Sequence, residues 1–351
     1  MLLIGNLQLD LPVVQAALSG YSDWPMRSIA RRMGAPYTVA EVMIDSFVNS
    51  LRERKRTSHF LMVREEDHPA GAQLMGADPD GFPEAAQKLV SAGFDVIDIN
   101  FGCPVKKVLG RCRGGFHLSQ PDVALEIIRR VRDVVPDQIP VTVKMRRGID
   151  DTDESREKFD EIIEGGWDAG IAAVTVHGRT VMQRYNGPSR WAFLKDLCQR
   201  YPDRTILGSG DLYSAEDCVR MIRETGVSGV TAARGSIGNP WIFSQARELL
   251  EGRPLPEPPT VSEQREVIEQ HYQFAVEVYS EARASRQLRK FGMRYADWHP
   301  DGDQVRADFV AAKNATMWQE TIKRWYHNDR SGVYPVSPGI PKPPAIREYQ
   351  H

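Results

Sequence analysis

Residues 99–115, INFGCPVKKVLGRCRGG, place a cysteine directly after an apolar strand pattern. We therefore expect Cys103 in a loop at the end of a strand and not in the core, where unreactive cysteines are commonest. Lys106 and Lys107 follow within about one helical turn, and nearby cations favour the thiolate form of a cysteine. The pattern makes Cys103 a candidate nucleophile or proton donor. A redox pair with Cys112 is a less favoured alternative.

Polar residues also end the other apolar segments, so that each of eight expected strands carries at least one. They are Ser19, Glu41, Gln73, Asn100 with Cys103, Lys144 with Arg146, His177 with Arg179, Ser209 with Asp211, and Arg234. In a barrel of parallel strands the carboxyl ends meet at one face, where active sites form. These side chains therefore predict a polar mouth.

Two of these strand ends, GSGD at 208–211 and AARGS at 232–236, carry glycines with free backbone N–H groups. Together with Arg234 they predict a phosphate site, although glycines also serve as ordinary turn residues. Lys144 ends a strand that should be buried, so its ammonium needs an anion or a polarisable ring. A salt bridge with Glu41 is the alternative. His177 either caps its strand or contacts a cofactor.

The expected elements alternate regularly between residue 12 and about residue 250. Strand patterns begin at residues 12, 36, 69, 94, 140, 171, 205 and 228, and helical patterns cover 25–33, 43–55, 80–92, 121–134, 153–168, 189–200, 214–225 and 239–250. Eight alternating units of this kind fit an α/β fold of the (β/α)8 TIM barrel type better than an open doubly wound sheet. We predict a TIM barrel followed by a small C-terminal helical bundle.

The rest of the chain divides by proline content and helical spacing. We expect a barrel over residues 1–250, a proline-rich linker over 251–262, a bundle of about four helices over 263–330 and an extended proline-rich tail over 331–351.

Composition excludes several classes of protein. The chain has 351 residues, 41% of them hydrophobic, and a formal net charge of -2. No apolar run reaches membrane-spanning length and the N-terminus does not resemble a signal peptide, so we expect a cytoplasmic protein without membrane contact, and a monomer. The net charge disfavours nucleic-acid binding by global charge alone. The four cysteines lack paired spacing, so neither a disulfide framework nor a metal site is expected.

Several motifs together resemble the dihydrouridine synthases, FMN-dependent enzymes that reduce uridine in tRNA. They are ALSGYSDWPMR at 17–27, EVM at 41–43, AQLMGADP at 72–79, INFGCPVKKV at 99–108, VTVKMRRG at 141–148, VTVHGRT at 174–180, AARGSIGNPWIF at 232–243 and LRKF at 288–291. The resemblance covers about residues 12–327. It implies FMN as the cofactor, NADPH as the reductant and tRNA as the partner.

The resemblance also implies roles for single residues. Cys103 would protonate uracil C5 while flavin N5 delivers hydride to C6, and Asn100 would hold the uracil, with Arg179 as a loosely assigned substrate contact. Lys144 would stabilise negative charge on the flavin ring. The full set of implied flavin contacts is Leu18, Gln73, Lys144, His177, Ser209, Gly210, Asp211, Arg234 and Gly235.

A uridine in folded RNA is stacked, so the enzyme would have to extrude it into the pocket while the bundle grips the RNA. The expected phosphate contacts lie on one bundle helix and are Arg283, Arg286, Arg289 and Lys290. Three tryptophans of the bundle have two possible roles, stacking on bases or filling the bundle core, and the core is favoured. They are Trp298, Trp318 and Trp325.

The chain departs from the family pattern at three places. AALSG stands for the usual APMAG, SGD for NGD, and GGFHL with its bulkier Phe116 and His117 for GSALL. Cys103, Lys144 and His177 are retained, which favours a working flavoenzyme. Two alternatives stay open: a related flavin reductase acting on another RNA such as rRNA or on a small molecule, and an RNA-binding paralogue that has lost its flavin.

Overall fold

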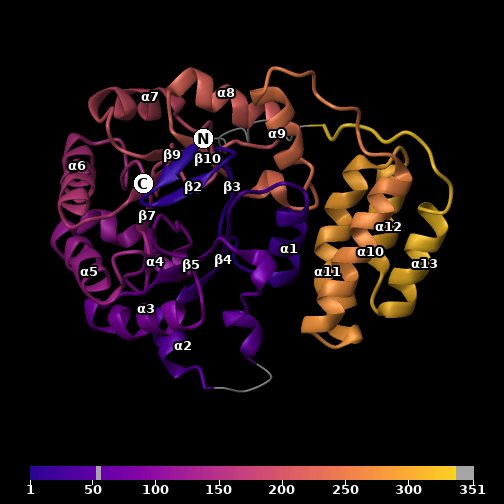
Figure 1. Cartoon of the computed structure of the whole chain (residues 1–351), viewed down its shortest axis with the longest axis horizontal. Coiled ribbons are helices and arrows are strands. Elements are labelled where there is room, and N and C mark those ends of the chain that lie inside the picture. The colour runs from indigo at the N-terminus through magenta and orange to yellow at the C-terminus, as the bar shows by residue number, and fades with distance from the viewer. Residues whose placement is uncertain (53–56, 337–351) are drawn as a thin grey trace, which may run out of the picture.

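A computed structural model describes residues 1–52 and 57–336 of the chain. Within these residues, eight parallel strands close into a barrel in which each strand pairs with its neighbours in sequence and the last pairs with the first (Figure 1). The strands are β3 (Val13–Gln15), β4 (Thr38–Ile44), β5 (Ala70–Met75), β6 (Val96–Phe101), β7 (Val141–Arg146), β8 (Ala173–His177), β9 (Ile206–Ser209) and β10 (Gly229–Ala232).

One principal helix follows each strand and packs outside the barrel. These helices are α1 (Trp24–Arg32), α2 (Asp45–Ser50), α3 (Phe82–Ser91), α5 (Pro121–Val134), α6 (Asp153–Asp168), α7 (Trp191–Arg200), α8 (Ala215–Thr225) and α9 (Ile242–Leu250). The predicted (β/α)8 barrel is therefore confirmed. Helix α2 is shorter than the predicted 43–55, of which residues 53–55 lie outside the described part of the chain.

Local sequence explains why these helices start and stop where they do. Ser214 caps α8 by accepting a hydrogen bond from the Asp217 N–H, and the Asp217 carboxylate in turn accepts from the Ser214 N–H. Gly226 ends the helix with φ of +77°, a conformation that costs glycine least. The apolar face of α8, which includes Cys218 and Met221, is buried against the barrel.

A short antiparallel hairpin precedes the barrel and was not predicted. It consists of β1 (Leu2–Ile4) and β2 (Leu7–Leu9). The inward side chains Leu2, Ile4 and Leu9 pack with strand residues of the barrel interior, while Leu3 points outward. The hairpin therefore covers the end of the barrel where the strands begin.

The C-terminal region is helical and has a core of its own. Between residues 261 and 325, all of them described, it contains four α-helices, as predicted: α10 (Val261–Val278), α11 (Glu281–Tyr295), α12 (Gly302–Ala311) and α13 (Ala315–Trp325). Trp298 and Trp318 are buried in this core, and Trp325 packs against it. Figure 1 shows the helical region beside the barrel, with α11 toward α1. Met26 of α1 belongs to the same core, so the two parts share an apolar interface.

Short helical turns complete the chain. Two lie after β6, namely α4 (Lys106–Leu109) and η4 (Gly114–Ser119), and the others are η1 (Ser58–Leu61), η2 (Glu65–Asp67), η3 (Pro79–Gly81), η5 (Arg234–Ser236) and η6 (Ala296–Trp298). Residues 331–336 have no regular secondary structure, in line with the predicted tail, and residues 337–351 lie outside the described part of the chain. Among the described helices, none is long and apolar enough to cross a membrane.

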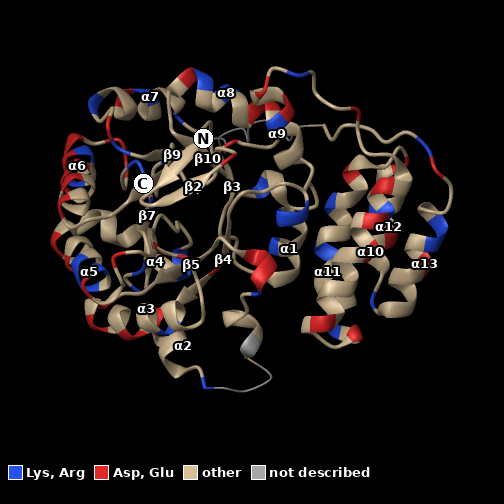
Figure 2. Ribbon diagram, viewed as in Figure 1, with Lys and Arg blue, Asp and Glu red and all other residues tan. Residues whose placement is uncertain are grey.

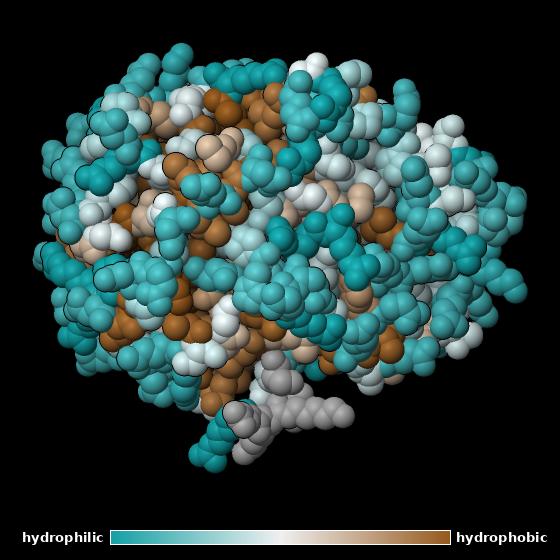
Figure 3. Space-filling model, in the orientation of Figure 1, coloured by the Kyte–Doolittle hydropathy of each residue, from teal (hydrophilic) through white to brown (hydrophobic). Residues whose placement is uncertain are grey.

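Charged residues are distributed over the outer helices. Figure 2 shows positions of acidic and basic residues intermixed along the helices around the barrel, and Lys and Arg on both α1 and α11. In the space-filling view, hydrophilic residues cover most of the visible face (Figure 3). The more apolar residues in that view show mainly over the barrel.

The hairpin provides a test of what covers this end of the barrel. Ile4→Ala removes a side chain that is 2% exposed, so it should lower the free energy of unfolding by about 2–5 kcal/mol. Leu3→Ala, next to it but 47% exposed, should change it by less than about 0.5 kcal/mol. Urea unfolding measures both. Equal effects would mean that the hairpin does not close the barrel.

Candidate active site

Strand register brings the predicted strand-end residues to one mouth. Asn100 of β6 lies opposite Lys144 of β7, while Arg146, two residues further along β7, lies opposite His177 of β8. His177 in turn lies opposite Ser209 of β9. Successive side chains of a strand point to opposite faces, so residues two apart share the barrel interior. The chemistry-bearing residues are thus held by the sheet itself.

A cavity runs into the barrel below this mouth. Its lining alternates along the strands and comprises Ile4, Val14, Ala16, Ala17, Tyr37, Val39, Gln73, Asp98, Thr142, Lys144, Ala173, Thr175, Leu207 and Thr231. The hairpin residue Ile4 belongs to this lining, which otherwise mixes small, apolar and polar side chains. The cavity has a volume of about 30 Å³, enough for about one water molecule, so a ring-shaped ligand would have to lie above it, across the polar strand ends of the mouth.

A chain of hydrogen bonds connects the interior of the barrel with the Cys103 loop. The Thr142 hydroxyl and the Gln73 amide each donate to the Asp98 carboxylate at 2.6 Å. The Asn100 amide then donates to the Gln73 side-chain oxygen at 2.7 Å. Finally, the Asn100 side-chain oxygen accepts from the Cys103 N–H at 3.0 Å. These contacts fix the orientation of both amides and the start of the loop.

Asp98 and Lys144 place opposite charges inside the barrel. Burial raises the pKa of the Asp98 carboxyl, and the hydrogen bonds from Thr142 and Gln73 and the charge of Lys144 oppose that rise. Burial lowers the pKa of Lys144 to about 8, although Asp98 favours its charged form. Among the described residues, none accepts a hydrogen bond from the Lys144 ammonium. The ammonium can therefore stabilise negative charge on a bound ring.

Cys103 is half-buried at the mouth, in a loop that packs tightly. A Cβ added to Gly114 would lie 2.8 Å from the Cys103 Cβ, and Gly115 donates its N–H to the Cys103 carbonyl at 3.1 Å. Glycine is required at both positions because no side chain fits. Lys106 and Lys107, which the sequence suggested as neighbouring cations, are exposed on α4.

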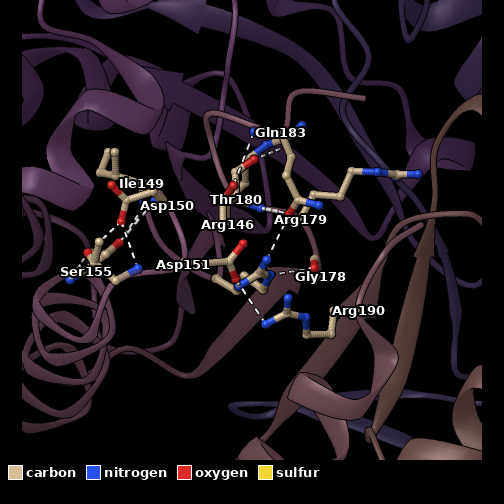
Figure 4. A network of polar contacts seen from close by, with 12 residues as sticks. Arg146, Ile149, Asp150, Asp151, Ser155, Gly178, Arg179, Thr180, Gln183 and Arg190 are labelled. Atoms are coloured by element: carbon tan, nitrogen blue, oxygen red, sulfur yellow. Dashed lines mark hydrogen bonds and ion pairs between the residues drawn. The ribbon is translucent and has the colours of Figure 1, made fainter. Parts of the chain in front are cut away.

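Arg146 is the cation that interacts electrostatically with Cys103. Its guanidinium donates to the Gly102 carbonyl at 2.9 Å and to the Thr180 carbonyl at 2.8 Å (Figure 4). Burial lowers its pKa to about 10. Tyr185, which is 46% exposed, lies with its ring 5.5 Å from the same guanidinium. Arg146 thus joins the Cys103 loop to the loop after β8.

Figure 4 shows the wider network in which Arg146 takes part. Gln183 accepts a hydrogen bond from the Thr180 N–H at 2.9 Å, which closes the turn after β8. Asp151, from the β7–α6 loop, pairs with Arg190 at 3.0 Å. The loops after β7 and β8 are therefore tied together beside the mouth.

His177 is a neutral hydrogen-bonding group in this site. Burial, together with the positive charges of Arg146, Lys144, Arg179 and Arg234, lowers its pKa well below the ordinary value. Its Nδ1 accepts the Arg179 N–H at 3.1 Å, so the ring proton resides on Nε2. The Nε2–H remains available to donate to a ligand.

The predicted phosphate site is organised around Asp211. This residue has φ of +59°, and its carboxylate accepts the Ser189 N–H at 2.7 Å. Arg179, whose side chain is fully buried, pairs with it at 2.7 Å, and Arg234 approaches it at 3.8 Å. The left-handed backbone is thus stabilised by charge-assisted hydrogen bonds. Arg179, expected to contact substrate, lies beneath the loop and not on an open surface.

Gly210, Gly235 and Arg234 are the other residues of the predicted phosphate site at the ends of β9 and β10. A Cβ on Gly210 would lie 2.4 Å from the Ser189 hydroxyl, and one on Gly235 would lie 2.2 Å from the Leu212 carbonyl oxygen. The Arg234 side chain is 39% exposed and lies between the rings of Tyr185 and Tyr213, at 5.0 and 5.1 Å. Close packing of the two turns therefore requires both glycines, and the partly exposed Arg234 guanidinium is a group that can meet an anion.

The remaining predicted residues differ in burial and contacts. Leu18 packs against the core of the helical region, and Ser209 is buried on β9. On α11, Arg286 and Arg289 are exposed, Arg283 lies 4.5 Å from the Tyr279 ring, and Lys290 turns toward the barrel.

Sequence reasoning missed Asp98 and Thr142, and it named Arg146 without a role. A signal for the first two exists: each lies two residues before a predicted site residue, Asn100 or Lys144, and therefore on the same face of its strand. Tyr185 carries no such signal because it lies in an irregular loop.

Comparisons with known proteins agree with this geometry. Residues 14–326 match the family model described as "Dihydrouridine synthase (Dus)". The chain is 30% identical over 316 residues to the "Probable tRNA-dihydrouridine synthase" of Rickettsia conorii, covering 90% of this chain and 92% of that protein. It is 33% identical over 317 residues to the protein of the same name from Mycobacterium tuberculosis, covering 88% and 81%.

Solved structures share the barrel at low sequence identity. Morphinone reductase matches with a TM-score of 0.54 and 15% identity, over 73% of this chain and 91% of that one. Histamine dehydrogenase from Rhizobium sp. 4-9 matches with a TM-score of 0.51 and 15% identity, over 77% and 50%. These likenesses concern the fold.

The lowered pKa of Lys144 predicts how stability depends on pH. Between about pH 8 and pH 10.5 the unfolded lysine holds a proton that the folded one has lost, so this group makes stability rise with pH. Lys144→Met should lack that rise, and Lys107→Met, at an exposed position, should keep it. Urea midpoints across this range measure the difference. Parallel profiles for wild type and Lys144→Met would contradict the burial of this charge.

Proposed function

The chain belongs to the dihydrouridine synthase family, and we propose that it reduces the C5–C6 double bond of a uridine in tRNA to give dihydrouridine. The observation that carries this proposal is the hydrogen-bonded chain from Asp98 through Gln73 and Asn100 to the Cys103 loop. This chain fixes the backbone of Cys103 beside the polar barrel interior. The half-buried thiol is thereby held in a position that suits proton delivery to a bound ring. The named relatives, which match over most of this chain, support tRNA as the substrate.

FMN is the cofactor that these residues fit best. Gln73 of β5, Lys144 of β7 and His177 of β8 lie toward the carboxyl ends of their strands, where they can contact a flavin ring placed across the mouth. Lys144 offers a cation without a described hydrogen-bond acceptor, and His177 offers a free N–H. When bound, the flavin would supply a hydride to the substrate and would be reduced again by NADPH. Leu18 and Ser209 are assigned to the edges of this pocket.

The FMN phosphate is assigned to the ends of β9 and β10. Gly210, Asp211 and Gly235 lie in these two turns, where neighbouring atoms leave no room for a side chain at either glycine, and Arg234 lies beside two tyrosine rings. Arg179 is assigned a supporting role, because its ion pair with Asp211 stabilises the left-handed turn.

Cys103 is assigned as the proton donor to uracil C5. Asn100 orients the backbone N–H of Cys103 and lies beside it, in a position to bind the uracil edge. Arg146, whose guanidinium links the Cys103 loop to the β8 loop, keeps this donor at the mouth.

The helical region is assigned to RNA binding. Arg286 and Arg289 are exposed on α11 and can neutralise phosphates. Arg283 lies on the same helix, with its guanidinium over the Tyr279 ring. A target uridine must leave its stack to reach a pocket inside the barrel. The domain boundaries, the monomeric state and the cytoplasmic location expected from the sequence stay predictions.

The role of Cys103 gives the most direct mutational test. Cys103→Ala should bind FMN as wild type does but lose dihydrouridine formation by about 10²–10⁴-fold, the range for loss of a general acid. Bound flavin is read from its absorption spectrum and the product by mass spectrometry of digested tRNA. Cys112→Ala, on the same loop but exposed, should stay active. Full activity in Cys103→Ala would contradict the assignment.

The phosphate assignment predicts a difference between two ligands. Arg234→Met should weaken FMN binding by about 10- to 100-fold, since a hydrogen bond to a charged group contributes about 1.5–3 kcal/mol. Riboflavin, which lacks the phosphate, should bind both proteins alike. Flavin fluorescence quenching measures both affinities, with Arg190→Met, a pair of Asp151, as the control. An equal loss for FMN and riboflavin would mean that Arg234 does not meet the phosphate.

A further inference from the structure

Lys290 lies among basic residues of α11, but it is partly buried and its ammonium contacts the barrel. Its ammonium donates to the Gly20 carbonyl in the loop after β3 and to the Gln287 side chain at 3.1 Å. It also lies 4.6 Å from the centroid of the Tyr21 ring. A lysine that neutralises RNA phosphates needs an exposed ammonium, as the guanidinium groups of Arg286 and Arg289 are exposed.

Gly20 is also held through its N–H, which belongs to the preceding peptide group. The Gly20 N–H donates to the Glu41 carboxylate at 2.6 Å, so Glu41 of β4 and Lys290 of α11 grip one residue between them. Gly20 has φ of +76°, which favours glycine, and nothing lies within 4 Å of a Cβ built there. Two ionic side chains, and not packing, therefore fix this residue.

Further contacts attach the loop to the helical region. The Tyr279 hydroxyl donates to the Asp23 carboxylate at 2.9 Å, and Asp23 also caps α1. The Tyr21 ring meets the Phe291 ring edge-on, with centroids 5.4 Å apart. Burial lowers the pKa of Lys290, while Asp23 and Glu41 favour its charged form. Groups of the barrel thus surround the Lys290 ammonium, namely the Gly20 carbonyl, the Tyr21 ring and the Asp23 and Glu41 carboxylates.

This loop leads directly into the candidate pocket. Ala16 and Ala17, which immediately follow β3, line the cavity, and the Leu18 carbonyl accepts hydrogen bonds from Tyr21 and Ser22 in a closed turn. A shift at Gly20 therefore reaches the cavity wall within three or four residues of chain. The position of this wall depends on a side chain that the helical region supplies.

We propose that Lys290 is a positioning residue that fixes the β3–α1 wall of the flavin pocket from the helical region, rather than a contact to RNA phosphate. The inference rests on the proposed function, because that function defines the ligands of the pocket and of α11. The helical region then has two roles, since it binds RNA on its exposed arginines and also completes the pocket in the barrel.

The test compares Lys290→Met with Arg286→Met, two changes of charge one turn apart on α11. Lys290→Met should weaken FMN binding to the RNA-free protein by about tenfold, since a charged hydrogen bond is lost, and leave the salt dependence of tRNA binding unchanged. Arg286→Met should bind FMN normally and lower the slope of log affinity against log salt by about one. Fluorescence quenching and filter binding measure the two quantities.

A second variant changes the barrel residue that contacts Gly20, namely Glu41. Glu41→Gln should also weaken FMN binding, and its effect should not multiply with that of Lys290→Met because both act on Gly20. If Lys290→Met does not fold, FMN binding by Glu41→Gln still tests the role of the contacts at Gly20.

Two results would overturn the inference. One is normal FMN affinity in folded Lys290→Met, and the other is a lower salt slope in that variant, which would make Lys290 a phosphate contact. Failure of the proposed function looks different, because the wild-type protein would then form no dihydrouridine in tRNA.

Discussion

The structure depends on two opposite charges inside a barrel of parallel strands. Asp98 and Lys144 lie where such barrels usually pack aliphatic side chains. A buried carboxylate needs hydrogen bonds, and Thr142 and Gln73 supply them. Satisfying Gln73 in turn orients Asn100, and Asn100 holds the Cys103 loop. The need to satisfy one buried charge thus determines the geometry of the mouth.

The same principle operates at the edges of the site. Asp211 adopts a left-handed backbone because Arg179 is buried against it, and Gly20 is held between Glu41 and Lys290. In each case a charged side chain fixes a loop whose backbone faces the mouth. The barrel provides the register, and these ion pairs and charged hydrogen bonds convert flexible loops into defined walls.

Periodicity in the sequence was sufficient to predict the fold, because eight β-branched runs alternate with helical segments such as residues 153–168, which match α6. It was insufficient for the β1–β2 hairpin, whose three-residue strands are too short to show a period. At the site, the strand ends predicted one polar mouth with Lys144 and His177, and these residues lie on the neighbouring strands β7 and β8, where Arg146 pairs with His177 and Lys144 with Thr175. The direction in which Arg179 and Lys290 point was not predictable, since it depends on residues such as Asp211 and Gly20 that are distant in sequence.

The reaction proposed for this mouth delivers a hydride and the Cys103 proton to one uridine of a tRNA. A single-turnover experiment tests it most directly: protein loaded with FMN is chemically reduced without oxygen and mixed with tRNA that lacks dihydrouridine. We expect the absorption of oxidised flavin to return while one uridine per enzyme gains two hydrogens. A flavin that stays reduced in the presence of this tRNA, or reoxidises without any change in uridine, would contradict it.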